Sequence, residues 1–233
     1  MNSHYTYLLI DFFTIIFPLA FSFHAKYQFS KKWKYLLPTI GIPALIFIAW
    51  DMAFTNMGVW GFNSKYTLGL YVYNLPIEEI LFFICVPYAC LFLYEVVNYF
   101  EKKDLVGPYA PYISIMLSMF LFSLGLLNNS RWYTGVTFIA CAILIALLQW
   151  KLKSPFLGRF YFSYVFILIP FFIVNGILTG SFLSEPVVWY NEKEMLGVRM
   201  GTIPFEDTFY GMMLLLMNIS IFEYQQIKNQ QPI

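Results

Sequence analysis

Two copies of a short acidic motif carry the chemistry that the sequence suggests. Each copy is a proline, any residue and two consecutive acids, followed by an apolar stretch: Pro76-Ile77-Glu78-Glu79 and Pro204-Phe205-Glu206-Asp207. A carboxyl group removed from water resists ionising, and two close together resist it further, so one can retain a proton at neutral pH. A retained proton makes a general acid, and an ionised neighbour makes a general base. Proline and acids also suit the first turn of any helix, which is the structural alternative for a single motif.

The two acids of one motif cannot share one role. Successive residues on a helix point about 100° apart, so both cannot aim into the same cavity. We favour Glu78 and Glu206, which are strictly repeated, as the groups that face a substrate. Glu79 and Asp207 are then their partners in the catalytic set.

Polar residues upstream of the motifs are candidates for a supporting role. They could hydrogen-bond the carboxylates, hold the loops shut, or be ordinary turn residues. Arg199 has no basic counterpart in the first motif, where Tyr71 stands, and could pair with Glu206 or Asp207. The other members of this group are Asn63, Lys65, Asn191 and Lys193.

Two further acids lie in apolar stretches. Asp11 falls inside the first stretch, and Asp51 falls near the end of the second. An ionisable residue inside a membrane segment is a functional candidate by default, although Asp51 could also reach the interface. Glu95 and Glu223 lie 17 residues beyond Glu78 and Glu206, roughly 26 Å along a helix, so we expect them on the opposite face.

The acidic motifs belong to a longer internal repeat. Sliding the chain along itself gives one clear register, at an offset of 204 − 76 = 128 residues. The shared pattern is N-x-K-x-x-L-G-x(6)-P-x-E-[ED]. The matched pairs are Asn63/Asn191, Lys65/Lys193, Leu68/Leu196, Gly69/Gly197, Pro76/Pro204, Glu78/Glu206, Glu79/Asp207 and Glu95/Glu223.

The elements that must position these motifs are membrane-spanning helices. Of the 233 residues, 60% are hydrophobic and 12% are charged, against roughly 45–50% and 25% in soluble domains. A span needs about 20 mostly apolar residues. Seven such stretches predict an all-α polytopic membrane protein: Tyr5–Phe23, Leu36–Phe54, Pro76–Val97, Tyr112–Leu127, Tyr133–Trp150, Phe160–Thr179 and Pro204–Phe222.

The repeat fixes how these helices are grouped. We expect a first three-helix repeat over residues 1–100, a linker with the fourth helix over 101–130, and a second repeat over 131–233. Because four crossings separate equivalent helices, the repeats run parallel, and a pseudo-two-fold axis should lie along the membrane normal. The matched motifs then face each other on one side of the membrane.

Basic residues predict the orientation. Alternating spans put ten Lys or Arg residues on one face and four on the other, so the N-terminus is expected outside and the C-terminus in the cytoplasm. The first stretch lacks a basic region before it and a small-residue cleavage site after it, which favours a retained helix over a signal peptide.

Several classes of protein find no support in the sequence. There is no G-x-G-x-x-G after a strand, no P-loop, no H-E-x-x-H and no Cys/His cluster. We therefore expect no cofactor, no metal and no nucleic-acid partner.

Aromatic residues make up 21% of the chain. They could fill membrane cores and interfaces, or line a site for a polyene and stabilise a carbocation.

The repeated PIEE and PFED motifs, with Asn-x-Lys and Leu-Gly before them, resemble the membrane-bound lycopene cyclases of bacteria, archaea and fungi. The chain looks like the fused form of the two small subunits of the heterodimeric enzyme, and the resemblance covers essentially the whole chain. It implies non-redox closure of the ψ end groups of lycopene to β-ionone rings, in an inner membrane and without a flavin. It also implies carotenoid substrates and possible contact with other enzymes of that pathway.

Two other readings remain open at this stage. A small-solute transporter with a three-one-three helix plan and parallel repeats would use the acids for proton coupling. Against it, the spans contain few Asn, Gln or Ser residues for a polar solute. The chain could also be a non-catalytic assembly partner of carotenoid enzymes.

Overall fold

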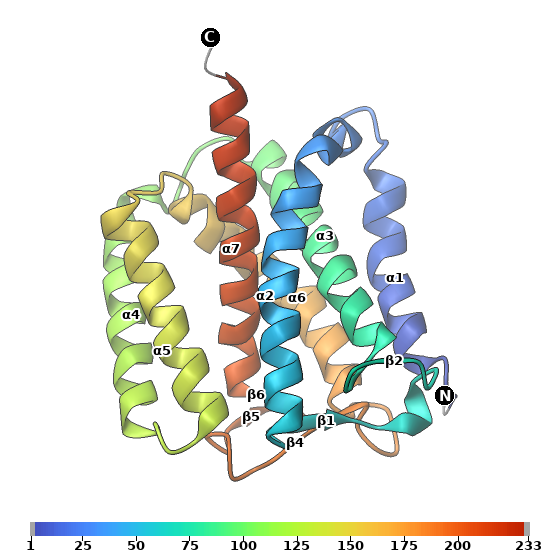
Figure 1. Cartoon of the computed structure of the whole chain (residues 1–233). Coiled ribbons are helices and arrows are strands. Elements are labelled where there is room, and N and C mark those ends of the chain that lie inside the picture. Colours follow the sequence, from blue (N-terminus) through green and yellow to red (C-terminus); the bar gives the residue numbers. More distant parts are fainter. Residues whose placement is uncertain (1–2, 231–233) are drawn as a thin grey trace.

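Seven helices form the chain in the computed structural model, which describes residues 3–230. All seven predicted spans are confirmed as helices, with ends shifted by a few residues (Figure 1). Five helical stretches are long and apolar enough to cross a bilayer, and the apolar first helix is shorter, at 16 residues. The helices are α1 (Thr6–Phe21), α2 (Leu36–Asn56), α3 (Ile77–Phe100), α4 (Ala110–Leu127), α5 (Trp132–Ala146), α6 (Leu157–Leu178) and α7 (Phe205–Gln230).

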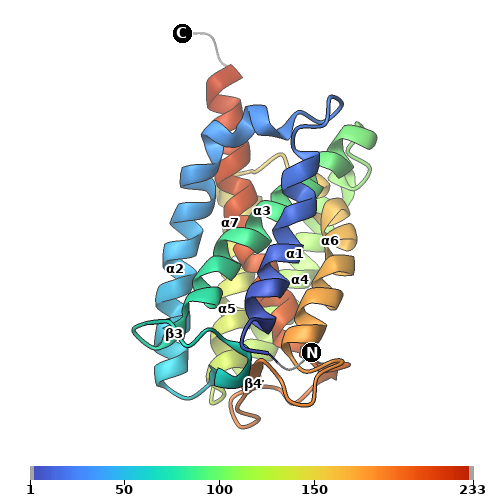
Figure 2. The ribbon, with the colours of Figure 1, turned by 90° about the vertical axis from the view of Figure 1, so that its right-hand side faces the viewer.

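The helices make two parallel three-helix repeats joined by a linker helix. The first repeat is α1 to α3, the second is α5 to α7, and α4 packs along α5 at one edge of the bundle (Figure 1). Figure 2 looks onto α1, which packs on α3 and lies beside α6. Helix α1 begins and α7 ends at opposite ends of the bundle (Figure 1).

A two-stranded ribbon joins the repeats at the N-terminal end of the bundle. Strand β1 (Trp60–Phe62) pairs antiparallel with β4 (Val188–Tyr190), and Gly61 lies opposite Trp189 at its centre. These strands are equivalent at the offset of 128, so each repeat pairs with its own counterpart. The flanking hydrogen bonds repeat too, from Asn63 N–H to the Val187 carbonyl and from Asn191 N–H to the Val59 carbonyl. A local two-fold axis therefore passes through the Gly61–Trp189 pair.

Each repeat also carries a small hairpin before its third helix. In the first repeat β2 (Tyr71–Val72) pairs with β3 (Leu75–Pro76), and in the second β5 (Arg199–Met200) pairs with β6 (Ile203–Pro204). The prolines end the hairpins and leave the next residue free to start α3 or α7. This geometry places both acidic pairs in the first turn of a helix, at the same end of the bundle.

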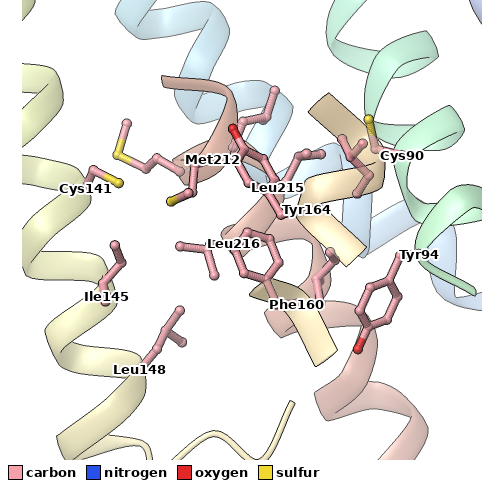
Figure 3. Close-up of a cluster of buried hydrophobic side chains, with 14 of the residues drawn as sticks. Cys90, Tyr94, Cys141, Ile145, Leu148, Phe160, Tyr164, Met212, Leu215 and Leu216 are labelled. Carbon is pink, nitrogen blue, oxygen red and sulfur yellow. The ribbon is translucent and has the colours of Figure 1, made fainter. Parts of the chain in front are cut away.

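The packed core lies among α2, α3, α5, α6 and α7. Figure 3 shows its centre, where side chains of α3, α5, α6 and α7 meet. Because these side chains are buried against one another, they hold α3 and α7 in a fixed relative position. Its labelled members are Cys90, Tyr94, Cys141, Ile145, Leu148, Phe160, Tyr164, Met212, Leu215 and Leu216.

Candidate active site

An elongated cavity of about 820 Å³ lies among α1, α3, α6 and α7. Along most of its length the lining is aliphatic and aromatic. Phe13 and Phe17 of α1 and Ile173 of α6 line it and are exposed by 57%, 62% and 61% of their surface. These side chains are exposed as well as cavity-lining, so the cavity is open at the side of the bundle, beside α1 and α6.

The loop end of this cavity is acidic. Asp51, Glu79 and Asp207 line it there, each less than one tenth exposed. They come from α2, α3 and α7, so both repeats contribute to one site. Buried charges are costly unless they are paired or hydrogen-bonded, and each of these three carboxyl groups has such partners.

Glu79 and Asp51 form a joined pair. Both line the acidic end of the cavity, and their carboxyl groups are close enough for a shared proton to join them. The Tyr7 hydroxyl donates to Glu79 Oε2 at 2.5 Å, and the Tyr210 hydroxyl donates to Asp51 Oδ1 at 2.9 Å. Tyr7 comes from α1 and Tyr210 from α7, so four helices hold this pair in place.

Asp207 has a different set of partners. The Tyr133 hydroxyl donates to its Oδ1. The Tyr190 hydroxyl and the Asn175 amide donate to its Oδ2 at 3.0 and 3.3 Å. Donors on both oxygens favour the ionised form of a carboxyl group.

Glu78 and Glu206 do not line the cavity, which differs from their expected role as the groups facing a substrate. Glu78 Oε1 accepts from the Leu68 N–H, and Glu206 Oε1 accepts from the Leu196 N–H, both at 2.6 Å. Each Leu precedes a glycine with a positive φ, Gly69 or Gly197. The repeated pattern therefore describes a loop closed by a glutamate, and the second acid of each pair faces the cavity.

The upstream loop residues hold loops and do not touch the site acids. Asn63 Nδ2 donates to Glu185 at 3.1 Å across the two repeats, and Lys65 lies 3.5 Å from the same carboxylate. In the second repeat, Asn191 Nδ2 donates to the Gly58 carbonyl, and Asn191 Oδ1 accepts from the Lys193 N–H. Asn63 caps Lys65 N–H in the same way as Asn191 caps Lys193 N–H.

Arg199 does not form the predicted ion pair with Glu206 or Asp207. Its guanidinium pairs with Glu192 at 2.6 Å and donates to the Thr202 carbonyl at 2.6 Å. Arg199 lies in the hairpin β5–β6, where it is paired with Pro204. Its side chain contacts residues of the same loop. A charge pair outside the cavity is the result.

Asp11 is the remaining intramembrane acid. It is 2% exposed, and neither carboxyl oxygen has a hydrogen-bond partner. Glu95 and Glu223 lie far from the site acids along α3 and α7, where Glu95 pairs with Lys32 at 2.5 Å and Glu223 accepts from Tyr94 at 2.6 Å.

The sequence did not single out the residues that bind the site acids. Tyr7 has Gly135 as its repeat equivalent and Tyr190 has Phe62, so the repeat gave no signal for them. The chain contains 18 tyrosines, and nothing in their spacing separates donors in the site from interfacial residues. Asn175 was detectable as a rare amide inside an apolar span. The missed partners are Tyr7, Tyr133, Asn175, Tyr190 and Tyr210.

Comparison with known proteins gives one consistent result. A family model described as lycopene cyclase matches residues 4–97 and 130–225, one segment in each repeat. The chain is also 28% identical over 179 residues to a bifunctional lycopene cyclase/phytoene synthase of Aspergillus niger; the match covers 72% of this chain and 28% of that relative. No solved structure matches. With its acids buried at the end of an apolar cavity and both repeats matched, the chain belongs to the lycopene cyclase family.

Proposed function

We propose that this chain closes the ψ end groups of lycopene into β-ionone rings by acid–base carbocation chemistry, without a change of redox state. The observation that carries the proposal is the cavity: three buried carboxyl groups lie at one end of an otherwise apolar channel that opens sideways. Such a site suits a long apolar substrate whose end group must be protonated and deprotonated.

The reaction needs a proton at C2 of the end group and a base near C6. Addition of the proton leaves a cation at C1, the C5–C6 double bond attacks it, and loss of the C6 proton restores neutrality. Trp60, Tyr133, Tyr190 and Tyr210 surround the acids and line the cavity, and aromatic faces attract a cation. An apolar cavity keeps out water that would trap the cation as an alcohol.

The nature of the lining favours a carotenoid over a polar solute. Of the residues that line the cavity away from the acids, nearly all are aliphatic or aromatic. A sugar-sized solute would leave its hydroxyl groups without partners there, at a cost of about 1–3 kcal/mol for each. Proton-coupled transport of such a solute is therefore the weaker hypothesis.

We further propose an orientation with the N-terminus and the site at the outer face and the C-terminus in the cytoplasm. The greater number of Lys and Arg residues in the loops at the opposite end from the site supports it. The substrate then enters from the bilayer between α1 and α6, without crossing an aqueous phase.

The relative is named for a lycopene cyclase joined to a phytoene synthase, and on that basis we propose that this chain works beside separate enzymes of the same pathway.

Pigment analysis tests the proposal. Lycopene-producing cells that express the chain should accumulate a carotenoid with β-ionone rings, and Glu79→Gln and Asp207→Asn should each abolish it at equal membrane abundance. Glu101→Gln, at the far end of α3, is the matched control and should leave the pigment unchanged. Unchanged lycopene in cells with folded, unsubstituted protein would refute cyclisation of this substrate.

A further inference from the structure

The two motif acids that line the cavity are repeat equivalents, but their surroundings differ. Glu79 has one phenol and a neighbouring carboxyl group, that of Asp51, whereas Asp207 has two phenols and an amide. We propose that the Glu79–Asp51 pair holds the proton that is delivered to the substrate, and that Asp207 is the base that removes the ring proton. This assignment rests on the proposed function and goes beyond it by giving each acid its own role.

Hydrogen-bond chemistry requires a proton in the Glu79–Asp51 pair. An ionised carboxylate can only accept hydrogen bonds. Two carboxyl groups that bond directly to each other must therefore share at least one proton. Tyr7 donates to Glu79 Oε2 and Tyr210 donates to Asp51 Oδ1, so each carboxyl group keeps one oxygen for the other. The pair therefore carries one proton in the resting enzyme.

The same reasoning favours an ionised Asp207. The amide nitrogen of Asn175 can only donate, and it donates to Oδ2, which also accepts from Tyr190. Oδ1 accepts from Tyr133. With donors on both oxygens, Asp207 has the environment of a carboxylate, which is the form that a base needs.

The residues that set these roles are positions where the repeats differ. At the offset of 128, the equivalent of Asp51 is Thr179 and the equivalent of Asn175 is Phe47. An acid partner is therefore present beside Glu79 and absent beside Asp207, and the amide donor shows the reverse distribution. The approximate two-fold symmetry of the site is broken at these positions.

The proposed step balances in atoms and electrons. The C1–C2 double bond takes the proton from the Glu79–Asp51 pair, and its electrons form the new C–H bond at C2. Electrons of the C5–C6 double bond form the C1–C6 bond, and the C6–H electrons form the ring double bond when Asp207 takes that proton. Return of the proton from Asp207 to the pair then restores the resting enzyme.

Asp51 is a positioning residue in this scheme, since it acts by keeping a proton on Glu79. Asp51→Asn would place an amide beside Glu79, and an amide donor favours the ionised form of the acid. Other groups that face the pair stay in place in this variant. They are Tyr7 and Asp11 from α1, Tyr210 and Asp207 from α7, and Tyr190 from β4.

The test is cyclisation of lycopene by isolated membranes in deuterated water, with mass analysis of both product and unreacted lycopene. Asp207→Asn should stop ring formation, yet unreacted lycopene should gain deuterium at its ends, since protonation remains reversible. Glu79→Gln should give neither product nor deuterium. Asp51→Asn should lower the rate at neutral pH by about 10²-fold or more and recover as the pH falls, which a merely structural defect would not do.

Tyr190→Phe supplies a second variant in case Asp207→Asn does not fold. It keeps the carboxyl group and installs the residue that the first repeat carries at the equivalent position, Phe62. The ratio of deuterated lycopene to cyclised product should rise. Deuterium exchange in Glu79→Gln but not in Asp207→Asn would overturn the assignment while leaving cyclisation intact. Absence of any cyclised product from the unsubstituted protein would refute the proposed function itself.

Discussion

Adjacent glutamates in the first turn of α3 should respond very differently to the same substitution. Glu78→Gln keeps the Oε1 acceptor for the Leu68 N–H, and its other oxygen, which is buried without a partner, becomes an amide nitrogen without a partner. The amide nitrogen has two N–H donors, so it leaves one more buried group unsatisfied than the carboxyl oxygen does, at a cost of about 1–3 kcal/mol. We therefore expect lower thermal stability but less than about a tenfold loss of cyclisation, since general acid–base groups contribute about 10²–10⁴-fold and this residue is outside the cavity.

Glu79→Gln should show the opposite pattern. The glutamine side chain has the same length and can still accept from Tyr7, so stability should change little. The proton that the pair delivers is lost, and cyclisation should fall by about 10²–10⁴-fold. The assay compares the rate of ring formation per folded molecule with the unfolding temperature in the same detergent. Loss of activity in Glu78→Gln at normal stability, or full activity in Glu79→Gln, would refute the division of roles between the two glutamates.

Three further changes test other parts of the structure. Gly61→Ala should destabilise the fold by about 1–3 kcal/mol, because a Cβ there would lie 2.4 Å from the indole ring of the paired strand; thermal unfolding measures this. The Asn63 amide and the Lys65 ammonium hold the pKa of Glu185 below its usual value, so their contact stabilises the loops above roughly pH 4.3 and is lost as the pH falls through the lower folded value. Proteolysis of the loops should increase in acid, and Glu185→Gln should remove that dependence. Gly211→Leu would project into the cavity, where a Cβ already contacts the Phe171 ring at 3.6 Å, and pigment analysis should show less cyclised carotenoid in a normally folded protein.

The sequence was sufficient for the helices and for the repeat. Apolar stretches of bilayer length have few alternatives to a helix, because every backbone polar group must be satisfied within the membrane. The gapless offset of 128 also predicted that equivalent motifs would lie at one end of the bundle, and both acidic pairs do start α3 and α7. The sequence therefore predicted the cavity-lining acids with an error of one residue: it favoured Glu78 and Glu206, and the cavity is lined by Glu79 and Asp207.

The orientation of those acids was not predictable in the same way. Strict repetition of Glu78 and Glu206 suggested a role in the cavity, but a loop that must be closed in each repeat also demands strict repetition. The acids that line the cavity, Glu79 and Asp207, are the ones that differ in type. Tyrosine donors such as Tyr7 were invisible, since which hydroxyl meets which carboxyl depends on how helices distant in sequence pack.

The ribbon that joins the repeats pairs two different residues at the same repeat position. Its central pair joins Gly61 to Trp189, which are the same position in the two repeats. Two copies of the first repeat would leave a hole at this point, and two copies of the second would set indole against indole. This junction therefore favours pairing of the first repeat with the second over pairing of either repeat with a copy of itself.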